Sequence, residues 1–221
     1  MRINKFEALA SGLSRRAADQ AITDGRVQVN GQPSQAGQGV EIGDAVTLDG
    51  RVITPPVKST TILLNKPTGY VVSRNGQGAP TVYDLLPPEL HSLKPIGRLD
   101  KDSSGLLLLT DNGDLAHELT HPSRQKQKLY EVSLDRPLQP LHRQMINDYG
   151  VQLDDGRSQL LLERQADGND HDWLVTMHEG RNRQIRRTFA SLGYTVTRLH
   201  RTQFGAYTLN ELPFGHWTAS E

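Results

Sequence analysis

A run of four leucines at positions 106–109 most constrains how this chain can fold. An apolar run of four to eight residues that ends in a turn signal is typical of a strand buried on both faces. Here Asp111, Asn112 and Gly113 follow the run, and we interpret Asn112-Gly113 as a two-residue hairpin turn. The charged residues before the run, from position 97 onward, are therefore expected to form a loop that leads into a core strand.

Asp100 in that loop is the first candidate for a catalytic group. Catalytic side chains are often carried by loops on a rigid scaffold. Arg98, two residues earlier, would share a face with Asp100 on an extended segment. Glycine at position 105 allows the backbone to approach another group closely. The competing interpretation is that Asp100 caps a turn, which is a common role for Asp in loops.

The composition bounds the class of protein. The chain has 221 residues, 35% of them apolar, which is enough for one medium and one small domain, and no apolar run is long enough to cross a membrane. The absence of cysteine excludes disulfides, thiolate catalysis and Cys-ligated zinc. His117 and His121 have a spacing that can hold a metal, but no third ligand lies nearby in the sequence, so we expect no metal site. The first residues lack the apolar core of a signal peptide, which favours a cytoplasmic protein.

Charge is unevenly distributed along the chain. The formal net charge of zero argues weakly against a nucleic-acid partner. Between positions 181 and 201, however, six arginines and one histidine occur with no acidic residue. A local basic strip is what phosphate binding requires, whatever the total charge. Arg181, Arg183, Arg186 and Arg187 are therefore candidate phosphate-binding residues, the alternative being a solvated basic surface.

The first 49 residues have the pattern of a small separate domain. We predict two helices within residues 3–24, the first ended by Gly12 and the second capped by Ser14, then a strand at 27–29 and short strands near Val40, Ile42, Val46 and Leu48. The basic residues of this domain are Lys5, Arg15, Arg16 and Arg26. Arg15 and Arg16 fall on the first turn of the second helix, where they could grip a phosphate.

Residues 50–60 contain Pro55-Pro56 and are predicted to be a linker to a second domain at 61–221. For that domain we predict strands at 61–64, 71–73, 128–134, 151–162 and 173–177, a strand pair at 196–204, and an exposed loop at 166–172. Helices are predicted at 83–86, 115–119, 138–146 and 185–192, the last ended by Gly193.

Several motifs resemble those of one known family. The segment from Gly97 to Thr110 resembles the central motif of the pseudouridine synthases, and residues 1–49 resemble the αL RNA-binding domain of a small-subunit ribosomal protein. Together the two resemblances cover nearly the whole chain. The further matching motifs are Lys66-Pro67-x-Gly69-Tyr70, Lys128-x-Tyr130-x-Val132, the stretch from Glu179 to Arg187, and Leu199-His200-Arg201 followed by Gly205.

This resemblance implies an α+β fold, in which a mixed, mainly antiparallel sheet with flanking helices follows the αL domain. It also implies roles for residues. Asp100 matches the catalytic carboxylate, Tyr130 the tyrosine that stacks on the target base, Arg186 the basic partner of the Asp, and Leu199 an apolar wall. The remaining residues that we expect to bind substrate are Arg98, Lys66, Arg181, Arg183 and Arg187. Arg183 stands where some members have His, and this version of the motif favours enzymes of large-subunit ribosomal RNA.

The implied reaction is the isomerisation of uridine to pseudouridine in ribosomal RNA by a monomeric enzyme. It needs no redox step and no external group, so no cofactor is expected. We expect Arg186 to keep Asp100 ionised. Asp100 could attack the sugar, or assist loss of the base and abstract a sugar proton. The alternative is a non-catalytic RNA-binding or ribosome-assembly protein, whereas an aspartate glycosidase would need two flanking carboxylates.

Overall fold

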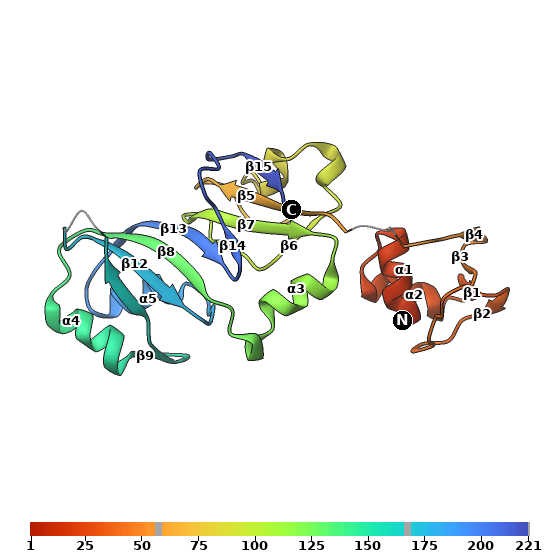
Figure 1. The fold of residues 1–221 in the computed structure, drawn as a ribbon, viewed down its shortest axis with the longest axis horizontal. Helices are drawn as coiled ribbons and strands as arrows, with labels where there is room; N and C mark the ends of the chain where they lie inside the picture. Colours follow the sequence, from red (N-terminus) through yellow and green to blue (C-terminus); the bar gives the residue numbers. More distant parts are fainter. Residues whose placement is uncertain (56–58, 166–168, 221) are drawn as a thin grey trace. The chain divides into compact units, whose positions relative to one another are not determined.

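The computed structural model describes residues 1–55, 59–165 and 169–220, and the chain divides into two compact units, Met1–Ser59 and Thr60–Glu221. Each unit has its own hydrophobic core: Ile3, Ile22 and Val27 belong to the first, and the leucines of positions 106–109 to the second. Figure 1 shows the elements of both units. Among the described residues, no helix combines the length and apolar content needed to cross a bilayer.

The first unit begins with the two predicted helices, α1 (Ile3–Ser11) and α2 (Arg15–Thr23). Helix α1 ends at Gly12, whose φ of 76° lies in the left-handed region that glycine tolerates. Helix α2 begins after Ser14, whose side chain accepts a hydrogen bond from the backbone N–H of Ala17. A small sheet follows, in the order β2 (Gln32–Pro33), β1 (Val27–Val29), β3 (Val46–Leu48) and β4 (Arg51–Val52).

Two expectations for the first unit need correction. Val40 and Ile42 form no strand, although Val40 is buried in the core. The predicted linker was also set too early, because Arg51–Val52 pairs with β3 and the backbone N–H of Ile53 donates to the carbonyl of Val46. Ile53 packs against the first core, so this apolar side chain keeps its segment with the first unit. The rest of the predicted linker includes residues 56–58, which lie outside the described residues.

The second unit is built on a large mixed sheet. Neighbouring strands pair antiparallel except β13 with β7, which pair parallel, so the expected mixed, mainly antiparallel sheet is confirmed. In sheet order the strands are β11 (Leu161–Arg164), β12 (Asp172–Met177), β8 (Lys128–Leu134), β13 (Val196–Phe204), β7 (Ser104–Thr110), β5 (Thr61–Lys66) and β15 (Trp217–Ala219), with β6 (Lys94–Pro95) beside β7 and β14 (Tyr207–Thr208) beside β13.

Strand β7 is the buried strand that the leucine run predicts. All seven of its residues are buried. Leu107 and Leu109 pack in one hydrophobic cluster, whereas Leu106 and Leu108 pack in another, as expected when alternate side chains point to opposite faces. A side chain of this kind contributes about 1.5–3 kcal/mol when fully buried. At Gly105, where φ is 106°, an added Cβ would lie 2.2 Å from the carbonyl oxygen of Arg201, so the contact between β7 and β13 requires glycine.

Asn112-Gly113 does not form the predicted hairpin turn. The Asn112 side chain accepts hydrogen bonds from the backbone N–H groups of Asp114 and Leu115, and it thereby caps helix α3 (Gly113–Thr120). Asn is favoured at helix N-caps as well as in turns, because in both its short side chain bonds to nearby backbone. The chain consequently leaves β7 through a helix rather than turning back as a hairpin.

Other elements differ from the pattern-based expectation in detail. Val71 makes a single bridge with Thr81 instead of a strand at 71–73. The helix expected at 83–86 is a 3-10 turn, η1 (Val82–Leu85), followed by another, η2 (Pro88–Leu90). The helix predicted at 138–146 is a short α4 (Pro140–Gln144) that continues as a π turn, η4 (Met145–Tyr149). The predicted strand at 151–162 is divided into a hairpin of β9 (Val151–Leu153) and β10 (Gly156–Ser158) and then β11.

Near the end of the chain, residues 196–204 form the single strand β13 rather than a strand pair. Strand β13 pairs with β8 along its whole length, and Gln203 and Phe204 also pair with β14. The predicted helix before Gly193 is confirmed as α5 (Gln184–Ser191), and the 3-10 turn η3 (Pro122–Arg124) follows α3. Residues 166–168 of the predicted exposed loop lie outside the described residues. The packing of α5 matters for function, because Ile185 and Phe189 hold this helix on the cluster that contains Tyr130 and Leu199.

Candidate active site

A cleft of about 1050 Å³ opens on the second unit. It is lined by the loop before β7, by β8 and β13, and by the segment that leads into α5. Six residues predicted from the sequence line it: Arg98, Asp100, Tyr130, Arg181, Arg183 and Leu199. Arg186, Arg187 and Lys66, which were also predicted to belong to the site, are not among the lining residues. The structure thus brings the predicted carboxylate, tyrosine and leucine to one place.

The floor of the cleft is formed by β8 and β13. In their register Tyr130 lies opposite Arg201, Lys128 opposite Phe204, and Leu199 opposite Val132. Lys128 and Tyr130 are two residues apart on β8, so they project from the same face. Tyr130 and Leu199 are each 7% exposed, which leaves only a small apolar surface of each available in the cleft.

Asp100 meets a cation at the edge of the cleft. Its carboxylate is 34% exposed, and its Oδ2 lies 3.4 Å from Nη1 of Arg183. The same guanidinium donates to both carboxylate oxygens of Asp102 at 2.9 Å. This bidentate contact holds the pKa of Asp102 below its ordinary value. Arg183 therefore bridges the two carboxylates of the loop.

The expected pairing of Arg186 with Asp100 is wrong. Arg186 Nη2 donates to the backbone carbonyl of Asp102 at 2.8 Å, and Nη1 donates to the carbonyl of Val196 at 2.7 Å. Its Nε lies 3.3 Å from Oδ2 of Asp102. Arg183 reaches Asp100 instead because it is the N-cap residue of α5 and has a left-handed backbone with φ of 45°. Arg186, one turn into the helix, holds the backbone of the Asp100 loop.

Lys66 supports the same loop from inside the protein. Its side chain is fully buried, and its three ammonium hydrogens meet the carbonyl oxygens of Pro67, Asp100 and Ser103 at 2.9, 3.0 and 2.7 Å. Burial lowers the pKa of Lys66 to about 8, outweighing the opposite effect of Asp100 and Asp102. Lys66 was expected to bind substrate, but its donors are occupied and it is closed off from solvent. It positions the Asp100 loop.

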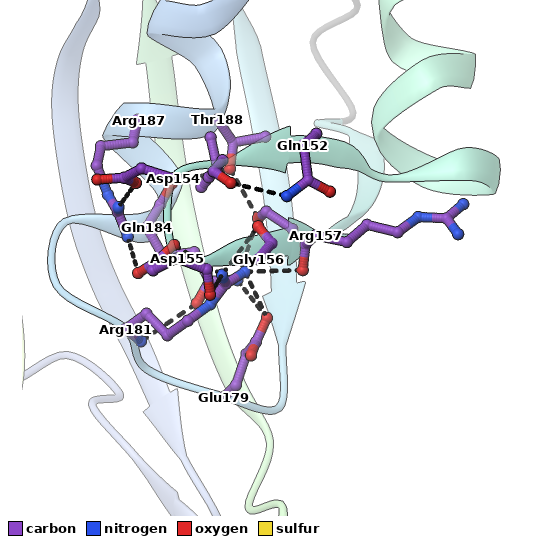
Figure 2. A network of polar contacts seen from close by, with 12 residues as sticks. Gln152, Asp154, Asp155, Gly156, Arg157, Glu179, Arg181, Gln184, Arg187 and Thr188 are labelled. Carbon is purple, nitrogen blue, oxygen red and sulfur yellow. Dashed lines mark hydrogen bonds and ion pairs between the residues drawn. The ribbon is translucent and has the colours of Figure 1, made fainter.

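Arg181 and Arg187 are also occupied (Figure 2). Arg187 Nη1 contacts Asp154 at 2.5 Å and its Nη2 contacts Asp155 at 2.6 Å, while Arg181 Nη1 donates to the Asp155 carboxylate at 2.8 Å. Arg181 also donates to three carbonyls of the β9–β10 hairpin and to Glu179. These two arginines were expected to bind substrate, but here they fasten the hairpin to the start of α5.

Comparison with known proteins identifies the family of this chain. A sequence model of the RNA pseudouridylate synthase family matches residues 60–191, and a model of the S4 domain matches residues 1–46. The chain belongs to the RNA pseudouridylate synthase family. A solved structure described as a pseudouridylate synthase is 31% identical, with a TM-score of 0.70, and the alignment covers all of this chain and 96% of that one.

Curated relatives of this chain support the family assignment. The ribosomal large subunit pseudouridine synthase B of Xylella fastidiosa is 39% identical, and the alignment covers 94% of this chain but 46% of the relative. The protein of the same name from Yersinia pestis is 36% identical, with 98% of this chain and 71% of the relative covered. The chain thus spans about half the length of the first of these relatives.

Two cationic residues that line the cleft, Lys128 and Arg201, were not among the predicted site residues. Lys128 and Arg201 occur in motifs that the sequence analysis quoted, and each is placed beside a predicted site residue by strand alternation or register. Lys128 is two residues from Tyr130, and Arg201 is two residues from Leu199. That spacing was the signal that could have assigned both to the cleft.

The predicted RNA-binding residues of the first unit differ in their partners. Arg15 and Arg16 are exposed and make no side-chain hydrogen bond or ion pair with the described part of the chain. Arg26, in contrast, donates to both carboxylate oxygens of Asp49, at 2.8 and 2.5 Å. Lys5 is half-buried on α1. Of these four predicted residues, Arg15 and Arg16 therefore combine an exposed position with an unoccupied guanidinium.

The histidine pair on α3 keeps a structural explanation. The rings of His117 and His121 meet edge to face, with centroids 4.8 Å apart, and His121 Nδ1 is within 2.8 Å of the Ser123 hydroxyl. Among the residues that the structure describes, no group of three His, Cys, Asp or Glu could hold a metal ion.

Proposed function

We propose that this chain isomerises uridine to pseudouridine in ribosomal RNA of the large subunit, with Asp100 as the catalytic carboxylate. The observation that carries the proposal is the convergence of Asp100 and Tyr130 in one cleft of a chain that belongs to the pseudouridylate synthase family. We choose large-subunit RNA as the substrate because the relatives from Xylella and Yersinia are named ribosomal large subunit pseudouridine synthases. Residues 1–46, which match the S4 domain, fit a second contact with RNA.

The reaction requires the target base to leave its stack before its glycosidic bond can be reached. The ring of Tyr130 and the side chain of Leu199 then provide an aromatic and an apolar surface for the extruded base. Arg98 is exposed at the cleft and can contact a flanking phosphate. These contacts would place the ribose of the target nucleotide beside Asp100.

The chemical step then balances within the nucleotide. The bond from the sugar to the ring nitrogen breaks, a bond from the sugar to ring carbon 5 forms, and the hydrogen of carbon 5 is replaced by one on the freed nitrogen. Asp100 acts at the sugar, either as the nucleophile or as the base that removes a sugar proton. Arg183 supplies the positive charge beside Asp100, and Lys66 and Arg186 hold the backbone that carries it.

The decisive test is Asp100→Asn, which keeps the shape of the side chain but removes the charge and the nucleophile. Single-turnover conversion of a ribosomal RNA fragment should be abolished, while filter binding of the same RNA should stay near the wild-type value. Asp102→Asn is the comparison variant, because it changes the same functional group two residues away. It weakens the contact with Arg183 and should therefore lower turnover without abolishing it. Substantial pseudouridine formation by a folded Asp100→Asn protein would refute the catalytic role.

The same experiment separates the enzyme from the non-catalytic alternative. An RNA-binding or ribosome-assembly protein would bind the fragment in both variants and convert it in neither, nor in the wild type. Mapping pseudouridines in ribosomal RNA from cells that lack this chain would then identify the target uridine. The proposal also includes a cytoplasmic location and a monomeric state for the enzyme.

A further inference from the structure

A second pair of cations lies in the cleft, apart from the Asp100 loop. Lys128 Nζ is 5.2 Å and Arg201 Cζ is 5.0 Å from the centroid of the Phe204 ring, so both cations contact one aromatic side chain. Arg201 is 2% exposed. Its Nε donates to the carbonyl of Leu106 at 2.8 Å, but its Nη2 is buried without a hydrogen-bond partner. A buried guanidinium with an unused donor needs an explanation.

The described residues do not neutralise this pair. Lys128 Nζ has only the carbonyl oxygens of Lys126 and Glu179 as acceptors, at 3.4 and 3.2 Å. Burial, and next the positive charge of Arg201, lower the pKa of Lys128. Two like charges held close together in a partly buried site oppose each other, and a bound anion would relieve that repulsion.

Nearby carboxylates have other partners. Glu179 Oε1 accepts from Arg181 and from Gln184, and Glu118 Oε1 is held by Lys126 at 2.8 Å. Asp100 is held by Arg183. Glu179 offsets part of the charge of Lys128, but its carboxylate is shared with Arg181 and Gln184, so a bound anion would supply the rest.

We propose that Lys128 and Arg201 bind a phosphate group of the RNA backbone next to the target nucleotide. This inference rests on the proposed function. Arg201 lies opposite Tyr130 in the sheet register, and Lys128 is two residues from Tyr130, so the two cations flank the surface assigned to the base. Uracil is neutral and cannot offset two positive charges, whereas the phosphates on the same ribose are anionic. Arginine suits this task because its planar donors match phosphate oxygens.

The test uses synthetic RNA fragments in which one phosphate at a time, around the target uridine, is replaced by a neutral methylphosphonate. The dissociation constant is measured for wild type and for Lys128→Met. Lys126→Met is the matched control, since Lys126 also lines the cleft but its ammonium is already paired with Glu118. For wild type, neutralising one phosphate beside the target should weaken binding about tenfold, the effect of one charge-assisted hydrogen bond.

Lys128→Met should bind unmodified RNA about tenfold more weakly, and neutralising that same phosphate should cause little further loss. Lys126→Met should respond to the methylphosphonates as wild type does. If the effect of Lys128→Met and the effect of each methylphosphonate on the dissociation constant multiply at every position, the two are independent, and the proposed phosphate site is overturned. It would equally be overturned if sensitivity to Lys128 followed changes in the base rather than in a phosphate.

Pseudouridine formation is read in the same samples, so the two proposals fail separately. Phosphate coupling without conversion by the wild type would support the phosphate site and refute the proposed function. Conversion without coupling would refute only the phosphate site. Arg201→Lys extends the test, because it keeps the charge but loses the planar fork, and it should weaken binding to unmodified RNA while the effect of the methylphosphonate shrinks.

Discussion

Arg15 and Arg16 of the first unit and the four arginines at positions 181–187 of the second unit are in opposite states. In the first unit, Arg15 and Arg16 are exposed and without a side-chain partner among the described residues. In the second unit, the arginines between positions 181 and 187 all contact carboxylates. A free cation gains affinity for RNA by releasing counterions, whereas an occupied cation must first give up a carboxylate. Basic residues that look alike in the sequence are therefore expected to act differently.

The occupied arginines at and before the start of α5 hold two acidic loops. Arg183 and Arg186 contact the loop that contains Asp100 and Asp102, and Arg181 and Arg187 contact the β9–β10 hairpin at Asp154 and Asp155 (Figure 2). Lys66 adds a fully buried contact beneath the first loop. The comparison separates cations that shape the site from cations that bind RNA.

The largest effect should come from the most deeply occupied cation. Lys66→Met leaves the carbonyls of Pro67, Asp100 and Ser103 without their donor, and we expect the free energy of unfolding to fall by about 3–5 kcal/mol. Urea denaturation measures this loss. Lys101→Met, an exposed change in the same loop, should stay within about 0.5 kcal/mol of wild type. Equal losses in the two variants would contradict the supporting role of Lys66.

A smaller effect is expected where carboxylates hold the hairpin. Asp155→Asn weakens contacts with both Arg181 and Arg187, so the segment that carries Arg183 should loosen. We expect kcat to fall about tenfold, because slight misplacement of groups at a reacting centre is costly. The salt dependence of RNA binding should not change. Asp154→Asn, which loses a single contact made by an 83% exposed side chain, is the control and should stay near wild type in single-turnover assays.

The free arginines of the first unit should affect binding alone. Replacing Arg15 and Arg16 together by Ala should reduce the slope of log K against log salt concentration by about 1.4, at about 0.7 per phosphate contact with a single strand. The rate of the bound complex should not change. Arg26→Ala removes an arginine already paired with Asp49, and it should leave the slope close to wild type. If Arg26→Ala changed this slope more than the double variant does, the paired arginine rather than the free ones would bind RNA.

The sequence predicted the local elements well because their signals are local. Helices α1 and α2, strand β7 and helix α5 follow from apolar spacing and from caps such as Gly12 and Ser14. Asn112 shows the limit of such signals, since the same residue type is suited to a turn and to a helix cap. The resemblance to the synthase family, rather than periodicity, placed Asp100, Tyr130 and Leu199 in one site.

The partners of the charged residues could not be predicted in the same way. Arg181 and Arg187 meet carboxylates 26 and 33 positions away in the sequence, on a hairpin that was predicted as one strand. Arg183, rather than the expected Arg186, lies beside Asp100 because the backbone of Arg183 is left-handed, which is uncommon for a residue other than glycine. Nothing in the motif around Lys66 indicates that three carbonyls would close over its ammonium. These facts depend on tertiary packing.

The smallest and most specific test concerns the pH dependence of that ammonium. An unfolded lysine has a pKa near 10.5, and burial lowers the pKa of Lys66 in the folded protein to about 8. Between these values the unfolded chain holds a proton at Lys66 that the folded chain has released, so this group makes stability rise with pH from about 8 to about 10.5. An ion-paired lysine would have a raised pKa and the opposite slope. The difference in unfolding free energy between wild type and Lys66→Met isolates this contribution, because groups such as Tyr83, whose pKa burial raises, titrate in both proteins and cancel. That difference should increase as the pH is raised through this window. A difference that stays constant up to pH 10.5 and falls only above it would mean that Lys66 is held by the carboxylates of Asp100 and Asp102 rather than by carbonyl oxygens.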